Sequence, residues 1–322
     1  MAQFHIDVHL GPDEQRATLE RDALEGLTCT PKSIPSKYFY DEVGADLFDQ
    51  ITRLDEYYLT RRETEIFLAR ADDISKLTGA DTFIELGSGT SNKTTILLDA
   101  FSQAGSLQRY IPFDVDEKTM RAAAQTIMAR YHDVSVHAVV GDFESHLSQI
   151  PHGGRRVLAF IGSTIGNLTG EQRKGFLAEV AEVLEPGDAF LLGADLMKDQ
   201  RRLELAYDDP AGVTAEFNRN VLRVLNKELQ ANFDVNKFQH VARFDEDHEW
   251  MQMSLRSTVD QEVRLSSIGL DIAFAKDERL LTEISAKFRR ESLEGELAEA
   301  GLEMRHWWTD TAGDFGVSLS FR

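Results

Sequence analysis

Apolar residues recur with two different spacings along the chain, and the change of spacing divides it. Residues 13–78 are mostly helical in pattern, with one helix expected over 14–27 and a second over 39–51. Thr60 and Glu63 have the spacing of a capping box, which predicts that a third helix begins there. Tyr57 then lies in the loop before that helix.

From residue 81 to 195 short apolar runs alternate with helical segments. The capping-box pair Thr169 and Gln172 predicts the start of the last of these helices. The alternation predicts a parallel sheet covered by helices on both faces. The expected strands are 82–86, 109–115, 134–142, 156–162 and 188–196, and the expected helices are 93–101, 118–131 and 171–184.

After Lys198 the alternation stops. The pattern predicts a helix over 212–229, a strand or hairpin of a smaller sheet over 249–265, a helix over 292–302 and a closing hairpin over 304–322. We therefore expect an α/β fold with a doubly wound parallel core and a closing antiparallel hairpin, beside a second, smaller α+β domain. The expected core comprises 61–198 and 287–322, and the expected second domain comprises 1–60 and 199–286.

Composition narrows the classes of partner. The 322 residues carry a formal net charge of −20, which repels phosphate backbones and anionic lipid heads, so we expect neither nucleic acid nor membrane as a partner. No apolar stretch is long enough to span a bilayer and no signal peptide is evident, which predicts a cytoplasmic protein. Cys29 is the single cysteine, and only His5 and His9 share helical spacing, in a polar terminus that we expect to fray; no metal is expected.

The first expected strand runs into a glycine-rich turn over 84–94. Gly87 and Gly89 allow a tight turn and a close approach of a ligand to the backbone, and the N–H groups of the next helix can receive a carboxylate or phosphate. The dinucleotide pattern needs a third glycine at Asn92, which disfavours NAD. Taken alone, this turn is a weak signal.

The tips of the next two expected strands carry acids. Asp114 is placed to accept the hydroxyls of a ribose, while Asp142 and Phe143 offer a carboxylate to an exocyclic amine and a ring to a purine. Each acid alone is more often a helix cap. Three consecutive strand tips in this order resemble the class I methyltransferases that use S-adenosylmethionine (SAM), so we expect SAM as cofactor.

The fourth expected strand ends in residues 162–168. Ligands of open α/β sheets bind beyond the carboxyl ends of the strands, so Asn167 is a candidate for contact with an acceptor substrate. A second interpretation, equally favoured by the residues alone, is that Asn167 supports the turn before Thr169.

Longer stretches resemble the histidine Nα-methyltransferases of ergothioneine biosynthesis, from about residue 13 to the C-terminus. They are 31–61, 84–94, 110–116, 141–143, 160–169, 206–222, 280–289 and 306–320. The resemblance implies a class I SAM-dependent methyltransferase core joined to a substrate-binding domain.

The resemblance also implies roles for individual residues. The implied cofactor contacts are Gly87, Lys93, Asp114, Asp142 and Phe143. The implied catalytic residues, Tyr57 and Asn167, hold the amino and carboxylate groups of the substrate together with Tyr207. Glu283 and Ser285 are implied to bind the imidazole, and the remaining pocket positions are Met253, Thr214, Tyr40, Phe48 and Gly162.

Elementary chemistry agrees with the implied imidazole contacts. Glu283 and Ser285 flank Ile284, so on a strand both point to one face, where a carboxylate and a hydroxyl can meet two ring nitrogens. A carboxylate left unpaired by the wrong ring disfavours that ring. The simpler alternatives are a solvated Glu283 and, for Met253 and Tyr207, ordinary packing.

The leading hypothesis is a monomeric enzyme that methylates the α-amino group of L-histidine three times, giving hercynine in an early step of ergothioneine biosynthesis. One alternative is an Nα-methyltransferase of another amino acid, such as tryptophan. Another is a SAM-binding protein without catalysis, and a dehydrogenase is disfavoured by Asn92.

Overall fold

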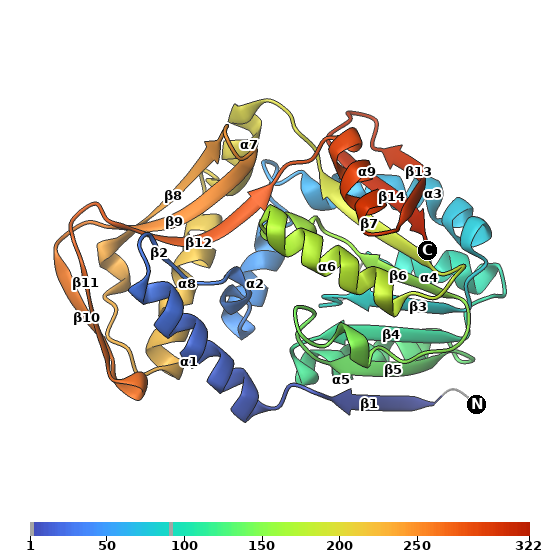
Figure 1. Cartoon of the computed structure of the whole chain (residues 1–322), viewed down its shortest axis with the longest axis horizontal. Coiled ribbons are helices and arrows are strands. Elements are labelled where there is room, and N and C mark those ends of the chain that lie inside the picture. Colours follow the sequence, from blue (N-terminus) through green and yellow to red (C-terminus); the bar gives the residue numbers. More distant parts are fainter. Residues whose placement is uncertain (1–2, 90–92) are drawn as a thin grey trace. The chain divides into compact units, whose positions relative to one another are not determined.

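The computed structural model describes residues 3–89 and 93–322, which form two compact units (Figure 1). Unit 1 combines Met1–Gly11, Arg61–Leu196 and Phe288–Arg322, and unit 2 combines Pro12–Thr60 and Met197–Lys287. Asn92, on which the argument against NAD rests, lies outside the described residues.

Unit 1 is built on an eight-stranded sheet with the order β1-β5-β4-β3-β6-β7-β14-β13. Neighbours from β1 to β7 are parallel, while β14 pairs antiparallel with both β7 and β13. The predicted α/β class, with a parallel core and a closing antiparallel hairpin, is confirmed. The strands are β1 (Phe4–Val8), β3 (Thr82–Leu86), β4 (Arg109–Asp114), β5 (Ser135–Val140), β6 (Arg156–Phe160), β7 (Ala189–Asp195), β13 (Glu303–Thr309) and β14 (Phe315–Phe321).

The order of strands predicts where a ligand binds. From β3 the chain continues outward to β4 and β5 on one side, and then returns to β6 and β7 on the other. In open α/β sheets the switch in direction opens a crevice at the carboxyl ends of the strands, here those of β3 and β6.

Helices cover both faces of this sheet. Every residue of β3, β6, β7 and β14 is buried, which requires cover above and below. Helix α5 packs against β4 and β5, and α6 lies in front of the sheet in Figure 1. The helices of this unit are α3 (Leu59–Thr78), α4 (Thr94–Gln103), α5 (Glu117–Arg130), η2 (Leu147–Gln149), η3 (Thr164–Asn167), α6 (Gly170–Val183) and α9 (Arg290–Glu299).

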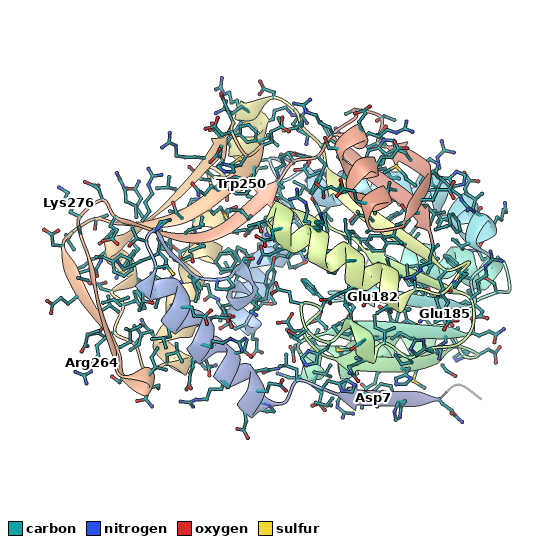
Figure 2. All side chains as sticks on the ribbon, viewed as in Figure 1. Asp7, Glu182, Glu185, Trp250, Arg264 and Lys276 are labelled. Atoms are coloured by element: carbon teal, nitrogen blue, oxygen red, sulfur yellow. The ribbon has the colours of Figure 1, made fainter. Side chains whose placement is uncertain are left out.

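The N-terminal segment differs from expectation. Residues 4–8 form β1 and pair in parallel with β5, so they belong to unit 1 and not to the segments that follow them. His5 lies opposite His137 in this register, and Asp7, labelled on β1 in Figure 2, accepts hydrogen bonds from both imidazoles. The expectation of a fraying terminus was wrong. The pairing with β5 orders this segment, and it was not foreseen because the partner strand is more than 120 residues away in the sequence.

Unit 2 contains a four-stranded sheet with the order β2-β12-β9-β8 and a separate hairpin of β10 and β11. Helix α8 packs against α2, β8 and β9. Its elements are α1 (Pro12–Thr28), β2 (Lys32–Ser33), η1 (Ser36–Phe39), α2 (Glu42–Ile51), α7 (Gln200–Tyr207), α8 (Val213–Glu228), η4 (Val235–Lys237), β8 (Phe238–Asp245), β9 (Trp250–Ser257), β10 (Gln261–Leu265), η5 (Ser266–Ile268), β11 (Leu270–Phe274) and β12 (Arg279–Ala286).

The period-two segment 249–265 does form strands, but its interpretation as one hairpin is wrong. Strand β9 has β8 on one side and β12 on the other, so no edge is left for β10, which pairs with β11 instead. None of the described helices of either unit is long and apolar enough to cross a membrane.

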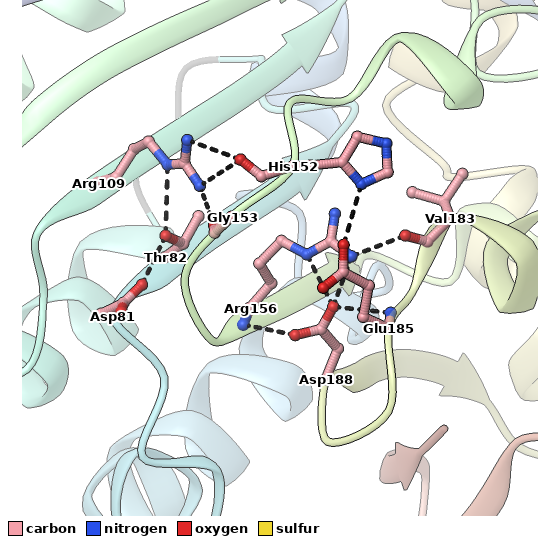
Figure 3. A network of polar contacts seen from close by, with 9 residues as sticks. All are labelled: Asp81, Thr82, Arg109, His152, Gly153, Arg156, Val183, Glu185 and Asp188. Atoms are coloured by element: carbon pink, nitrogen blue, oxygen red, sulfur yellow. Dashed lines mark hydrogen bonds and ion pairs between the residues drawn. The ribbon is translucent and has the colours of Figure 1, made fainter.

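A buried ion pair ties together the amino ends of β6 and β7 (Figure 3). Arg156 donates through its backbone N–H to Asp188 Oδ1 at 2.8 Å and through Nε to Oδ2 at 2.7 Å. Its Nη2 also donates to the carbonyl of Val183 at 2.7 Å. Both charged side chains are almost fully buried, so this network fixes the helix-to-strand turn that precedes β7.

Candidate active site

The glycine turn after β3 leaves its backbone open. Gly87 has φ +69° and Gly89 has φ +45°, and a Cβ atom built on either would meet nothing within 4 Å. The Gly87 N–H donates to the Phe113 carbonyl at 2.8 Å, which holds the turn against the end of β4. This turn can therefore receive a ligand directly against the main chain.

Asp114 is fixed beside that turn. Its Oδ2 accepts the Gly89 N–H at 3.0 Å and its Oδ1 accepts the Val115 N–H at 2.7 Å. Desolvation raises the pKa of Asp114, and these backbone hydrogen bonds oppose the rise. A carboxylate oriented in this way has the chemistry to accept both hydroxyls of a ribose.

Asp142 and Phe143 follow β5, as expected. Asp142 is buried, and its Oδ1 accepts the Glu144 N–H at 2.9 Å. This bond belongs to a turn over 143–145, so Asp142 is not the helix cap that was the alternative to ligand contact. The Phe143 ring packs edge-on against Phe160 and Phe176, at centroid distances of 5.2 and 5.9 Å. Packing fixes the orientation of this ring.

Glu63 lies at the carboxyl ends of the strands, although its spacing from Thr60 predicts a helix cap. Helix α3 begins at Leu59 and not at Thr60, and the fully buried Glu63 carboxylate pairs with Lys93 and accepts the Gly162 N–H at 2.7 Å. The capping prediction for Glu63 was therefore wrong. No signal near Glu63 in the sequence reveals partners that lie 30 and 99 residues away.

A second buried carboxylate, that of Glu85, lies on β3 just before the glycine turn. It accepts hydrogen bonds from Thr94 Oγ1 and, at 2.6 Å, from the Tyr110 hydroxyl. Desolvation raises the pKa of Glu85 to about 7, against the opposing effects of those two hydrogen bonds and of Lys93.

The loop after β6 has a constrained backbone. Gly162 has φ +80°, and Ser163 has φ +62° although it carries a side chain. Ser163 Oγ accepts the Asp195 N–H at 2.9 Å, which holds this conformation. Asn167 ends η3 in this loop and is half-buried.

In unit 2 the predicted aromatic residues form one cluster. Phe48 lies 5.4 Å from Tyr40 and 6.2 Å from Tyr57, and Tyr57 lies 6.5 Å from Tyr207 between ring centroids. Tyr57 and Tyr207 are 8% and 6% exposed. Tyr40 is 49% exposed as a whole, yet desolvation at its hydroxyl and then the Glu283 carboxylate raise the pKa of its phenol.

Glu283 and Ser285 lie on one face of β12, as the sequence predicts. Glu283 stands opposite Met253 on β9, and a register shift between Leu281 and Glu283 immediately precedes the pair. Met253 is 2% exposed. This face thus combines a carboxylate, a hydroxyl and a buried thioether.

Lys287 was missed by the sequence analysis. Its buried ammonium donates to the Tyr207 hydroxyl at 2.8 Å and to Ser285 Oγ at 2.9 Å, and these two oxygens are themselves 2.8 Å apart. A lysine next to a strand end gives no pattern of its own, so only the fold reveals it.

Hydrogen bonds to the backbone hold two further predicted residues, Tyr207 and Thr214. His240 Nε2 lies 2.8 Å from the Tyr207 carbonyl and its Nδ1 lies 2.8 Å from Asn218 Nδ2, so we assign a neutral ring that donates through Nε2. Desolvation lowers the pKa of His240, in agreement with that state. Thr214, in the first turn of α8, donates its N–H to Asp209 Oδ1 at 2.7 Å.

One group of residues in unit 1 has metal-binding chemistry. The ligand atoms of His5, Asp7 and His137 lie within 4.8 Å of one another. The imidazoles of His5 and His137 lie 2.9 and 2.7 Å from the Asp7 carboxylate. Their hydrogen bonds, above all that of His137, lower the pKa of Asp7, and partial desolvation of the carboxylate opposes this shift. We assign this cluster to the pairing of β1 with β5.

Comparison with known proteins identifies the family. The family model of histidine-specific, SAM-dependent methyltransferases matches residues 19–322. The chain belongs to this family. It is 55% identical to the histidine N-alpha-methyltransferase of Mycolicibacterium smegmatis over 98% of both chains, and 55% identical to that of Mycobacterium tuberculosis over 97% of both.

A more distant relative acts on another amino acid. The L-tryptophan methyltransferase of Psilocybe serbica is 26% identical over 93% of this chain and 91% of its own. Family membership makes the protein a methyltransferase that uses SAM. Three features of unit 1 have chemistry that fits that cofactor. The open backbone at Gly87 and Gly89 lets a ligand approach the main chain, and the oriented Asp114 carboxylate can accept ribose hydroxyls. The Lys93 ammonium can pair with the carboxylate of SAM.

Proposed function

We propose that this methyltransferase acts on L-histidine, transferring three methyl groups to its α-amino nitrogen to give hercynine, an early step of ergothioneine biosynthesis. The observation that carries the proposal is the pairing of Glu283 and Ser285 on one face of β12, opposite a buried methionine. A carboxylate accepts one imidazole N–H and a hydroxyl donates to the other nitrogen. Family membership supports the same substrate.

The amino and carboxylate groups of histidine are assigned to the tyrosines and Asn167. In our proposal Tyr207 binds the substrate carboxylate, and Lys287 fixes the direction of its hydroxyl. Tyr57 and Asn167 orient the α-nitrogen lone pair, which is the catalytic role in an in-line transfer. The α-ammonium must lose a proton before each transfer, and the Tyr57 hydroxyl is the candidate to relay it.

We propose that unit 1 binds the cofactor through Gly87, Lys93, Asp114, Asp142 and Phe143. SAM supplies an electrophilic methyl group on a sulfonium centre. Asp114 accepts the ribose hydroxyls, Asp142 the exocyclic amine of the adenine, and Phe143 lies against the ring. Lys93 binds the methionyl carboxylate.

The remaining predicted residues shape a pocket for a cation. Tyr40 and Phe48 belong to the aromatic cluster, whose ring faces attract a quaternary ammonium such as the trimethylated product. Met253 contributes an adaptable apolar wall. The proposal also assigns substrate contacts to Thr214 of unit 2 and to Gly162 of unit 1.

Unit 2 is accordingly proposed as the substrate-binding domain of a cytoplasmic monomer. Cys29, the single cysteine of the sequence, is exposed, and the net charge of −20 disfavours self-association. Light scattering after size exclusion tests the monomer, which has a mass of 36.3 kDa.

Mass spectrometry tests the proposed reaction. The purified protein is incubated with SAM and all twenty amino acids, and every methylated product is identified. We expect histidine alone to gain about 42 Da, which is the mass added when three methyl groups replace three hydrogen atoms. Methylation of tryptophan would support the first alternative, and cofactor binding without any methylation would support a non-catalytic SAM-binding protein.

A further inference from the structure

Glu63 occupies an unusual place for a buried acid. Its side chain is fully buried, yet it projects from α3 to the carboxyl ends of β3 and β6, the edge at which open α/β sheets bind their ligands. One carboxylate oxygen pairs with Lys93, directly before α4, and the other accepts the N–H of Gly162, two residues after the end of β6. A single side chain thus ties together the two loops that flank the crevice.

The backbone around Glu63 is shaped to admit it. A Cβ atom on Gly193, in the middle of β7, would lie 2.2 Å from Glu63 Oε1, so the carboxylate occupies space that only a glycine leaves. On the other side, a Cβ atom on Gly162 would lie 3.6 Å from Lys93 Nζ. The absence of a side chain at Gly193 therefore leaves the space that the Glu63 carboxylate occupies.

A buried ion pair is a poor source of stability, because desolvation of the two charges offsets most of their attraction. This pair also lies at a functional site, and its cation is not fully enclosed: the Lys93 side chain is 24% exposed, whereas that of Glu63 is 0% exposed. An ammonium has three N–H donors, and Glu63 takes one of them. The arrangement suits a cation that is held in place on one side and presented to an anion on the other.

We propose that Glu63 is a positioning residue of the cofactor site. It holds the Lys93 ammonium where it meets the carboxylate of SAM, and it fixes Gly162 at the start of the loop that carries Asn167. Without Glu63 the four-carbon lysine side chain is flexible and reaches the carboxylate only in some of its rotamers. The proposal rests on the role proposed above for Lys93, but it adds a residue that does not itself touch the cofactor.

The test measures binding, so that it does not depend on the amino-acid substrate. Calorimetry gives the affinity of the purified protein for S-adenosylhomocysteine, which carries the carboxylate, and for 5′-methylthioadenosine, which lacks it. We expect Glu63→Gln to weaken S-adenosylhomocysteine binding by about tenfold to a hundredfold and 5′-methylthioadenosine binding by less than about twofold. The amide still accepts the Gly162 N–H but points an NH₂ group at Lys93.

Two further variants separate this proposal from its alternatives. Lys93→Met should show the same selective loss, and Glu63→Gln added to Lys93→Met should weaken S-adenosylhomocysteine binding no further, because Glu63 acts through Lys93. Asp188→Asn breaks a second buried ion pair of this unit, and we expect it to lower the melting temperature while leaving both affinities unchanged.

Three results would overturn the proposal. Equal losses for both ligands in Glu63→Gln would make Glu63 a general structural support, and an additive double variant would mean that it acts apart from Lys93. An unchanged affinity in Lys93→Met would refute the role of Lys93 itself, and the positioning role with it. Transfer to histidine is scored separately, so failure of the proposed reaction leaves these outcomes readable.

Discussion

Two buried ion pairs lie at opposite edges of the unit 1 sheet, one at the amino ends of its strands and one at the carboxyl ends, and they differ in what surrounds them. Arg156 and Asp188, at the amino ends of β6 and β7, have side chains that are 0% and 4% exposed and are tied further to the main chain. Glu63 and Lys93 lie at the carboxyl ends, where Lys93 remains 24% exposed. Burial of both charges indicates a structural role, whereas a cation left accessible in a ligand crevice indicates a functional one.

The largest effect should come from the amino-end pair. Asp188→Asn leaves Arg156 buried without a countercharge, and we expect it to lower the free energy of unfolding by about 3–5 kcal/mol. Urea denaturation of the variant and the parent measures the difference. An effect smaller than about 1 kcal/mol would contradict the structural role given to this pair.

At the carboxyl ends of the strands, the titration of Glu85 should make the free energy of unfolding fall as pH rises. Its pKa is raised to about 7 in the fold, so between pH 4.5 and 7 the unfolded chain has lost a proton that the folded chain retains. Stability contributed by this group is therefore present below pH 4.5 and declines up to about pH 7, by about 3 kcal/mol.

Glu85→Gln provides the measurement of that decline. The hydroxyls of Thr94 and Tyr110 can accept as well as donate, so the amide is accommodated. The unfolding free energy of the parent minus that of the variant, measured from pH 4.5 to 7.5, should fall as pH rises. A difference that stayed constant with pH would show that Glu85 titrates normally.

The smallest effect should come from a helix cap on the same unit. Thr169 and Gln172 form the predicted capping box of α6, with the Thr169 N–H donating to Gln172 Oε1 at 2.9 Å. Thr169→Ala should lower the unfolding free energy by about 1 kcal/mol and leave cofactor affinity unchanged. A changed affinity for S-adenosylhomocysteine would mean that the cap also shapes the loop that contains Asn167.

These two helix starts show how far sequence reasoning reaches. Thr60 with Glu63 and Thr169 with Gln172 have the same spacing, and only the second pair is a capping box. The spacing reports a local possibility, whereas the partners of Glu63 lie 30 and 99 residues away in the chain. Local pattern cannot distinguish the two cases.

The parallel core was predictable because alternation of strands and helices is a local property, and the expected strands match β3 to β7 within two residues at each end. Strand β1 was missed because its partner β5 is distant in sequence. In unit 2 the resemblance to a family supplied the candidate residues. Lys287 and His240 had no motif, since their importance comes from Tyr207, which they contact in the fold.

The central claim, that the β12 face of unit 2 selects histidine through Glu283, is tested most directly by a ratio. The kcat/KM for histidine is divided by that for tryptophan in the parent, in Glu283→Ala and in a control, Glu262→Ala, which removes an exposed glutamate of the same unit. We predict that the ratio falls by about a hundredfold in Glu283→Ala and does not change in the control. An undiminished ratio in Glu283→Ala would contradict the account.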